Sequence, residues 1–214
     1  MDAATVDWDE RADAAIARYR GGEGRDLDQR QLTQLGNAAW AAGLCLLAAG
    51  ADDDAAVWLH CAAERYRESW PDAPPDSWGR PIGAMKSLLL AGDDASAAAR
   101  WALDAGAADA ESPIGRYAAT LALLVLGDGA QARMVAPTLA GRDDFPGDVA
   151  AAVGAIAFCD ADAYAAAVLD VLRSFETRTE FLEDVPVADT VLVLQALAEP
   201  RGIAAELPAS PRLP

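Results

Sequence analysis

Residues 87–103 read SLLLAGDDASAAARWAL, and this stretch decides the fold that the sequence predicts. An apolar run ends at Gly92, two aspartates follow, and an alanine-rich run then leads to Trp101. Glycine adopts the left-handed conformation that closes a helix, and an aspartate side chain accepts hydrogen bonds from the free amides that open the next one. The negative charges of Asp93 and Asp94 also suit the positive end of that second helix. The stretch therefore predicts two consecutive helices joined by a tight turn.

The same arrangement recurs on both sides of this hairpin. LLAAGADDDAAVW occupies 46–58, LLVLGDGAQARMV occupies 123–135, and AIAFCDADAYAAAVL occupies 155–169 with Cys159 where the glycine would stand. The turns follow one another at intervals of about 30 to 40 residues, which fits helix-turn-helix units of the tetratricopeptide class, whose repeat is about 34 residues. We therefore predict an all-α fold, a tetratricopeptide-like helix-turn-helix repeat array (an α-solenoid) of about ten to twelve helices.

The composition favours one helical domain over the whole chain. Of the 214 residues, 53% are apolar. Alanine is abundant while β-branched and aromatic residues are sparse, which favours helices over a sheet. We expect a single domain over 1–214, with an irregular start at 1–6 and a proline-rich tail at 203–214 laid over the end of the array. Pro137 should kink or shorten the helix that begins after Gly129.

The charge balance limits the kinds of partner. Asp and Glu number 34 against 17 Lys and Arg, which gives a formal net charge of −17. So negative a surface repels nucleic acid and anionic membranes and attracts a basic protein. We therefore expect a basic protein partner, no nucleic acid and no membrane. Solubility alone is the alternative explanation of the acidity.

The cysteines and the start of the chain bear on its location. Cys45, Cys61 and Cys159 lie in apolar runs at no metal-like spacing. An odd number of cysteines favours free buried thiols in a reducing compartment. The start, MDAATVDWDERADAA, has neither the basic region nor the apolar core of a secretion signal. The expected location is cytoplasmic.

His60 is the only histidine, so any catalytic arrangement that uses a histidine base depends on it. Glu64 follows it by one helical turn, and a structural pairing of these two side chains is favoured over metal binding or proton transfer. The chain has no His-x-x-x-His, Cys-x-x-Cys or glycine-rich phosphate loop. We therefore predict no catalytic, metal-binding or cofactor-binding residue, and no cofactor.

Eight residues are candidates for partner binding because they carry charge or aromatic surface at corresponding parts of the repeats. They are Asp53, Asp54, Trp58, Arg65, Trp78, Asp93, Asp94 and Arg100. The aspartates lack the loop pattern of a calcium site and are better explained as helix caps. For the basic residues of this region, pairing with nearby acids is favoured over binding an anionic ligand or a partner's carboxylate. That set is Arg65, Arg67, Arg80, Lys86 and Arg100.

Two stretches carry a resemblance to a known family. DSW at 76–78 opens an apolar helix that ends in LAGDD at 90–94. The end of the chain reads TVLVLQALAEPRGI at 190–203, followed by Leu-Pro at 207–208 and at 213–214. Together these stretches resemble the middle and the C-terminal end of the immunity protein 49 family of bacterial polymorphic toxin systems. That family is all-helical, and the resemblance implies a cytoplasmic inhibitor that protects its host by binding a cognate toxin.

The leading hypothesis is a non-enzymatic protein-binding protein, in its specific form an immunity protein that neutralises a basic toxin through its acidic surface. One alternative is a ligand-binding or enzymatic helical domain with a pocket near Trp58, His60 and Arg100. A second alternative is a regulatory or assembly module that acts as a homodimer.

Overall fold

The computed structural model describes residues 6–214, and all regular elements in this part of the chain are helical. The ten α-helices are α1 (Trp8–Gly22), α2 (Gln29–Ala48), α3 (Asp52–Glu68), α4 (Gly79–Leu90), α5 (Ser96–Asp104), α6 (Pro113–Val125), α7 (Gly129–Val135), α8 (Gly147–Phe158), α9 (Ala161–Thr177) and α10 (Asp189–Ala198). Short 3-10 turns are η1 (Ala107–Asp109), η2 (Ala136–Leu139), η3 (Leu182–Asp184) and η4 (Glu199–Arg201). The predicted all-α class and the number of about ten helices are confirmed. Most of the irregular start predicted at 1–6 lies outside the described residues.

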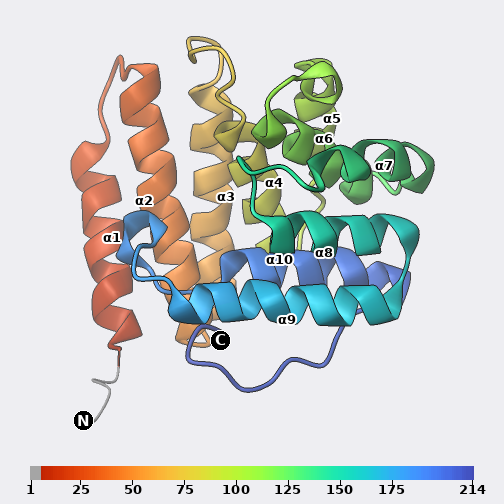
Figure 1. Cartoon of the computed structure of the whole chain (residues 1–214). Coiled ribbons are helices and arrows are strands. Elements are labelled where there is room, and N and C mark those ends of the chain that lie inside the picture. The colour runs from red at the N-terminus through yellow and green to blue at the C-terminus, as the bar shows by residue number, and fades with distance from the viewer. Residues whose placement is uncertain (1–5) are drawn as a thin grey trace.

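The first four helices lie side by side in chain order (Figure 1). α1 packs against α2, α2 against α3, and α3 against α4. The start of α2 is fixed by Asp28, whose carboxylate accepts hydrogen bonds from the amides of Arg30 and Gln31. The Gln31 side chain in turn accepts from the Asp28 amide at 2.9 Å. This reciprocal capping satisfies amides that the helix itself leaves unpaired.

The turns at the ends of α2, α4, α6 and α8 have the left-handed backbone that the recurring sequence pattern predicts. The φ angle is 76° at Gly50, 73° at Gly92, 72° at Gly127 and 54° at Cys159. Cys159 therefore takes the conformation that glycine takes at the other three turns. Its side chain is exposed, whereas Cys45 is buried and Cys61 is half-buried. The prediction of buried thiols is thus wrong for Cys159, because the turn holds this residue outside the core.

Pro137 shortens α7 as predicted. The helix ends at Val135, and the chain continues as the 3-10 turn η2, which contains the proline. Proline has no amide hydrogen to donate, and its ring clashes with the preceding helical turn.

The C-terminal part of the chain folds back on the first part. α8 and α9 form a hairpin, and α10 packs against both of them and against α4 (Figure 1). The turn η3 also contacts α2. In a one-dimensional repeat array each unit contacts only its neighbours. Because these contacts join distant units, the repeat-array prediction is not confirmed.

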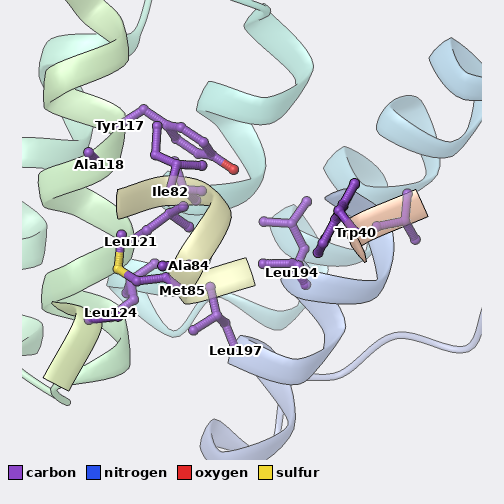
Figure 2. Close-up of a cluster of buried hydrophobic side chains, with 14 of the residues drawn as sticks. Trp40, Ile82, Ala84, Met85, Tyr117, Ala118, Leu121, Leu124, Leu194 and Leu197 are labelled. Atoms are coloured by element: carbon purple, nitrogen blue, oxygen red, sulfur yellow. The ribbon is translucent and has the colours of Figure 1, made fainter. Parts of the chain in front are cut away.

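The core joins both parts of the chain (Figure 2). Trp40 of α2, Met85 of α4, Leu121 of α6 and Leu194 of α10 are buried members of one apolar cluster. Burying one large apolar side chain contributes roughly 1.5–3 kcal/mol relative to its exposed state. α10 is therefore an integral part of the core.

The tail at 203–214 is bonded to the last two helices. The Gln195 side chain of α10 donates a hydrogen bond to the Ala205 carbonyl at 2.7 Å. The Ser210 hydroxyl donates to the Glu176 carboxylate of α9, also at 2.7 Å. These bonds place the tail along the outer side of α9 and α10 (Figure 1).

Candidate functional site

A groove of about 610 Å³ lies over α4, between α3 and α5. Its floor and its α5 wall are apolar and consist of five residues: Ala84, Leu88, Ala97, Ala98 and Trp101. Its α3 wall is mostly polar and consists of His60, Ala63, Glu64, Arg67 and Glu68. The small alanines leave space between the helices. A groove with an apolar floor and a charged rim is the form in which proteins accept the apolar face of a partner helix.

Trp101 lines the groove wall, offers a partner little exposed surface, and is held in a fixed position. Its side chain is only 7% exposed. The Arg67 guanidinium lies over its ring, 4.6 Å from the ring centroid. The Trp70 ring meets it edge-on at a centroid distance of 5.5 Å. Its buried Nε1 has no hydrogen-bond partner among the described residues. Packing on both sides therefore sets the position of the ring.

His60 lies at one end of the groove and pairs with Asp93. The distance from His60 Nε2 to Asp93 Oδ2 is 2.5 Å, and the two side chains are 46% and 52% exposed. The expected pairing of His60 with Glu64 is wrong, because the loop after α4 brings Asp93 to the imidazole. The neighbouring Asp94 accepts a hydrogen bond from the Ser96 amide. Hydrogen bonds from Ser96 hold the pKa of Asp94 below its usual value.

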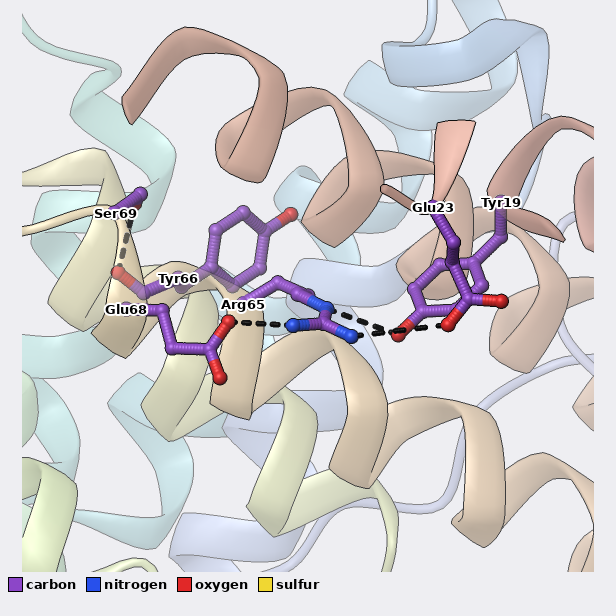
Figure 3. Close-up of polar contacts among 6 residues, drawn as sticks. All are labelled: Tyr19, Glu23, Arg65, Tyr66, Glu68 and Ser69. Atoms are coloured by element: carbon purple, nitrogen blue, oxygen red, sulfur yellow. Dashed lines mark hydrogen bonds and ion pairs between the residues drawn. The ribbon is translucent and has the colours of Figure 1, made fainter. Parts of the chain in front are cut away.

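Arg65 faces away from this groove and joins α3 to α1 (Figure 3). Its Nε donates to the Tyr19 hydroxyl at 3.0 Å, and its Nη1 donates to Glu68 at 2.6 Å. Its Nη2 lies 3.8 Å from Glu23 at the end of α1. Burial alone would lower the pKa of Arg65, but the hydrogen bonds to Glu68 and Tyr19 raise it. Arg65 therefore has its hydrogen-bonding groups engaged within the protein.

The other predicted partner-binding residues do not gather at one place. Trp58 lies on the α1 side of α3, with its ring centroid 5.2 Å from that of Tyr19. Asp53 and Asp54 are exposed in the first turn of α3, and Arg100 is exposed on α5 outside the groove. The structure therefore does not bring Trp58, His60 and Arg100 together in one pocket.

Trp78 is buried at the start of α4. Its Nε1 donates to Asp76 at 3.0 Å, and its ring centroid lies 5.8 Å from that of Trp70. A residue in this position packs the interior and offers a partner almost no surface.

Sequence reasoning missed the alanines of the groove. In the sequence, Ala97 and Ala98 indicate only a helix. They stand one turn before Trp101 and therefore share a side of α5 with it. Small residues one turn from an aromatic residue are the signal that could have found this surface.

Comparison with known proteins found no matching protein-family model, no similar curated protein and no similar solved structure. The tetratricopeptide class and the immunity protein 49 family therefore stay predictions from the residues. Within residues 6–214, no group of three or more His, Cys, Asp or Glu side chains is placed to hold a metal ion. The helices of this same part of the chain include none with the length and apolar character that crossing a membrane requires.

Proposed function

We propose that this chain is a protein-binding module whose groove over α4 takes an amphipathic helix from a basic partner protein. The groove carries the proposal, because an apolar floor beneath a charged rim matches the two faces of such a helix. The apolar face of the partner helix would lie on Leu88 and Ala97, the more exposed apolar residues of the groove.

The charge of the chain favours a basic partner. The formal net charge of −17 speeds the encounter with a positively charged protein. On the rim, Glu64 is exposed and forms no ion pair with any residue of 6–214. Its carboxylate is thus free to pair with a Lys or Arg of the partner.

The resemblance to the immunity protein 49 family gives this proposal its most specific form. In that form the partner is a cognate toxin, the chain is its inhibitor, and the complex forms in the cytoplasm of a bacterium. The acidic composition supports this role, because it attracts a basic toxin. A homodimeric assembly module is the competing function.

The test is affinity capture from the native cytoplasm with three baits: the wild type, Ala97→Trp and Ala163→Trp. Ala97 is exposed in the first turn of α5, where an indole would fill the groove. Ala163 is the matched control, because it is exposed in the first turn of α9 and does not line the groove. We expect Ala97→Trp to weaken binding of the captured partner at least about tenfold, or ~1.4 kcal/mol, and Ala163→Trp to leave it unchanged.

The purified partner is then titrated at low and at moderate salt. We expect it to be basic and its affinity to fall as salt rises, because screening weakens the attraction between exposed charges. A partner that binds Ala97→Trp as tightly as the wild type would overturn the groove assignment. Self-association alone would replace this function with the homodimeric module.

A further inference from the structure

A second pocket lies apart from the groove, among α2, α3, α4, η3 and α10. Its volume is about 350 Å³, which is within the range of small-molecule sites. Trp40, Tyr66 and Ile82 form its apolar and aromatic surface. Arg80, Lys86 and Asp189 are its charged residues. The charged groups decide what the pocket can bind.

Arg80 is a buried cation without an anionic partner. Its residue is only 9% exposed. Its Nε donates to the Ser69 hydroxyl at 2.8 Å, and its Nη2 donates to the Gln29 side-chain oxygen. Both acceptors are neutral. None of the carboxylates of residues 6–214 forms an ion pair with Arg80, and its Nη1 donates to no atom of this part of the chain.

The position of Arg80 is electrostatically unfavourable. Burying a charge without a counter-charge costs free energy, and burial accordingly lowers the pKa of Arg80. Arg80 also lies in the first turn of α4, where the helix dipole repels a cation. The same turn has no side-chain cap, and Ser77 and Gly79 beside it line the pocket. An anion in the pocket would meet both the guanidinium and the positive end of α4.

The charges of the pocket select a singly charged anion. Lys86 forms an ion pair with Asp189, so these two charges offset each other and Arg80 supplies the one remaining positive charge. The planar guanidinium matches the geometry of a carboxylate. A phosphate dianion would leave one negative charge unbalanced. Trp40, Tyr66 and Ile82 line the pocket with apolar atoms, which suits a small apolar body attached to that carboxylate, and Lys86 Nζ lies 5.5 Å from the centroid of the Trp40 ring.

We infer that this pocket binds a small organic monocarboxylate, with the carboxylate paired to Arg80 and the apolar body against the apolar lining of the pocket. This site is separate from the groove over α4, and its ligand could bind whether or not a protein partner is present.

Calorimetric titration of the full chain with benzoate, phenylacetate and indole-3-acetate tests the inference. The controls are the corresponding amides, which have the same shape without the charge, and inorganic phosphate. We expect at least one carboxylate to bind in the millimolar range or tighter, at least tenfold more tightly than its amide and than phosphate. Equal binding of an acid and its amide would overturn the inference, and so would binding of phosphate alone or of none of the probes.

Two variants locate the binding. Arg80→Met removes the guanidinium but keeps an apolar stem, and we expect a loss of carboxylate affinity of tenfold or more. Thr33→Leu leaves Arg80 in place and narrows the pocket, and we expect it also to weaken binding. Arg173→Met, at an exposed arginine of α9, is the matched control and should bind as the wild type does. If Arg80→Met does not fold, unchanged carboxylate binding by Thr33→Leu would overturn the location.

Discussion

The ring of Tyr66 lies so close to Gly83 that a Cβ atom on this glycine would stand 2.6 Å from a ring carbon. A Cβ atom on Gly36 of α2 would meet the other edge of the ring at 2.8 Å. The Tyr66 hydroxyl donates to the Asn37 side chain at 2.9 Å. One aromatic residue of α3 therefore sets the spacing of both neighbouring helices, and each neighbour has a glycine where the ring needs room.

Gly83→Ala should destabilise the protein. Overpacking a tight site costs about 1–3 kcal/mol, and the better helix propensity of alanine returns up to about 1 kcal/mol. We expect the free energy of unfolding, measured by urea denaturation, to fall by about 1–2 kcal/mol. Gly154→Ala in α8 is the control, because no atom lies within 4 Å of its added Cβ. That variant should gain about 0.5–1 kcal/mol, and an equal gain in Gly83→Ala would contradict the tight contact with Tyr66.

Asp189→Asn should loosen the attachment of α10. Lys86 donates to Asp189 and, at 3.2 Å, to the Thr190 hydroxyl, and the side chains of the ion pair are 13% and 17% exposed. Breaking a buried pair costs up to about 3–5 kcal/mol, so for this partly solvated pair we expect a loss of about 2 kcal/mol. Asp170→Asn, in the exposed pair with Arg173, is the control and should change stability by less than about 0.5 kcal/mol. Hydrogen exchange checks the location: the amides of α10 should exchange faster only in Asp189→Asn.

The local structure was predictable from the sequence because its signals are local. The turns at Gly92 and Cys159 and the break at Pro137 each depend on a few adjacent residues. The ion pair of Lys86 with Asp189 joins residues that are 103 positions apart, and no pattern in the chain relates them. The return of α10 to α4 therefore could not be predicted, and this return is what departs from a simple repeat array.

The candidate sites were less predictable, for a related reason. The sequence around an arginine does not show whether the side chain is buried, so no sequence pattern separates the buried Arg80 from the exposed Arg100. His60 had an acid one turn away on its own helix, yet a loop residue, Asp93, reached it instead. In both cases, contacts between residues far apart in the sequence determine the surroundings of the side chain.

Alkaline pH should destabilise the protein. Burial raises the pKa of Cys45 from its ordinary 9.0 to about 11. Burial also raises the pKa values of Tyr66, Tyr117 and Tyr164 above their ordinary 10.0. The folded state therefore holds these protons when the unfolded chain has already lost them, so this contribution is complete below pH 9 and is lost as pH rises through 11. We expect the urea midpoint to fall steadily from pH 9 to 11, and a constant midpoint would contradict the burial of these groups.

Cys159→Gly should stabilise the turn between α8 and α9. A residue with a side chain loses about 1 kcal/mol or more in the left-handed conformation, whereas glycine adopts it freely. Glycine also makes the unfolded chain more flexible, which offsets part of this gain by about 0.4–1 kcal/mol. We expect a net stabilisation of about 0.5 kcal/mol, measured by urea denaturation. Cys159→Ala is the control: it removes the same exposed thiol but keeps a Cβ atom in the left-handed backbone, so its stability should stay close to that of the wild type. An equal gain in both variants would mean that the thiol, and not the backbone conformation, is the source of the strain.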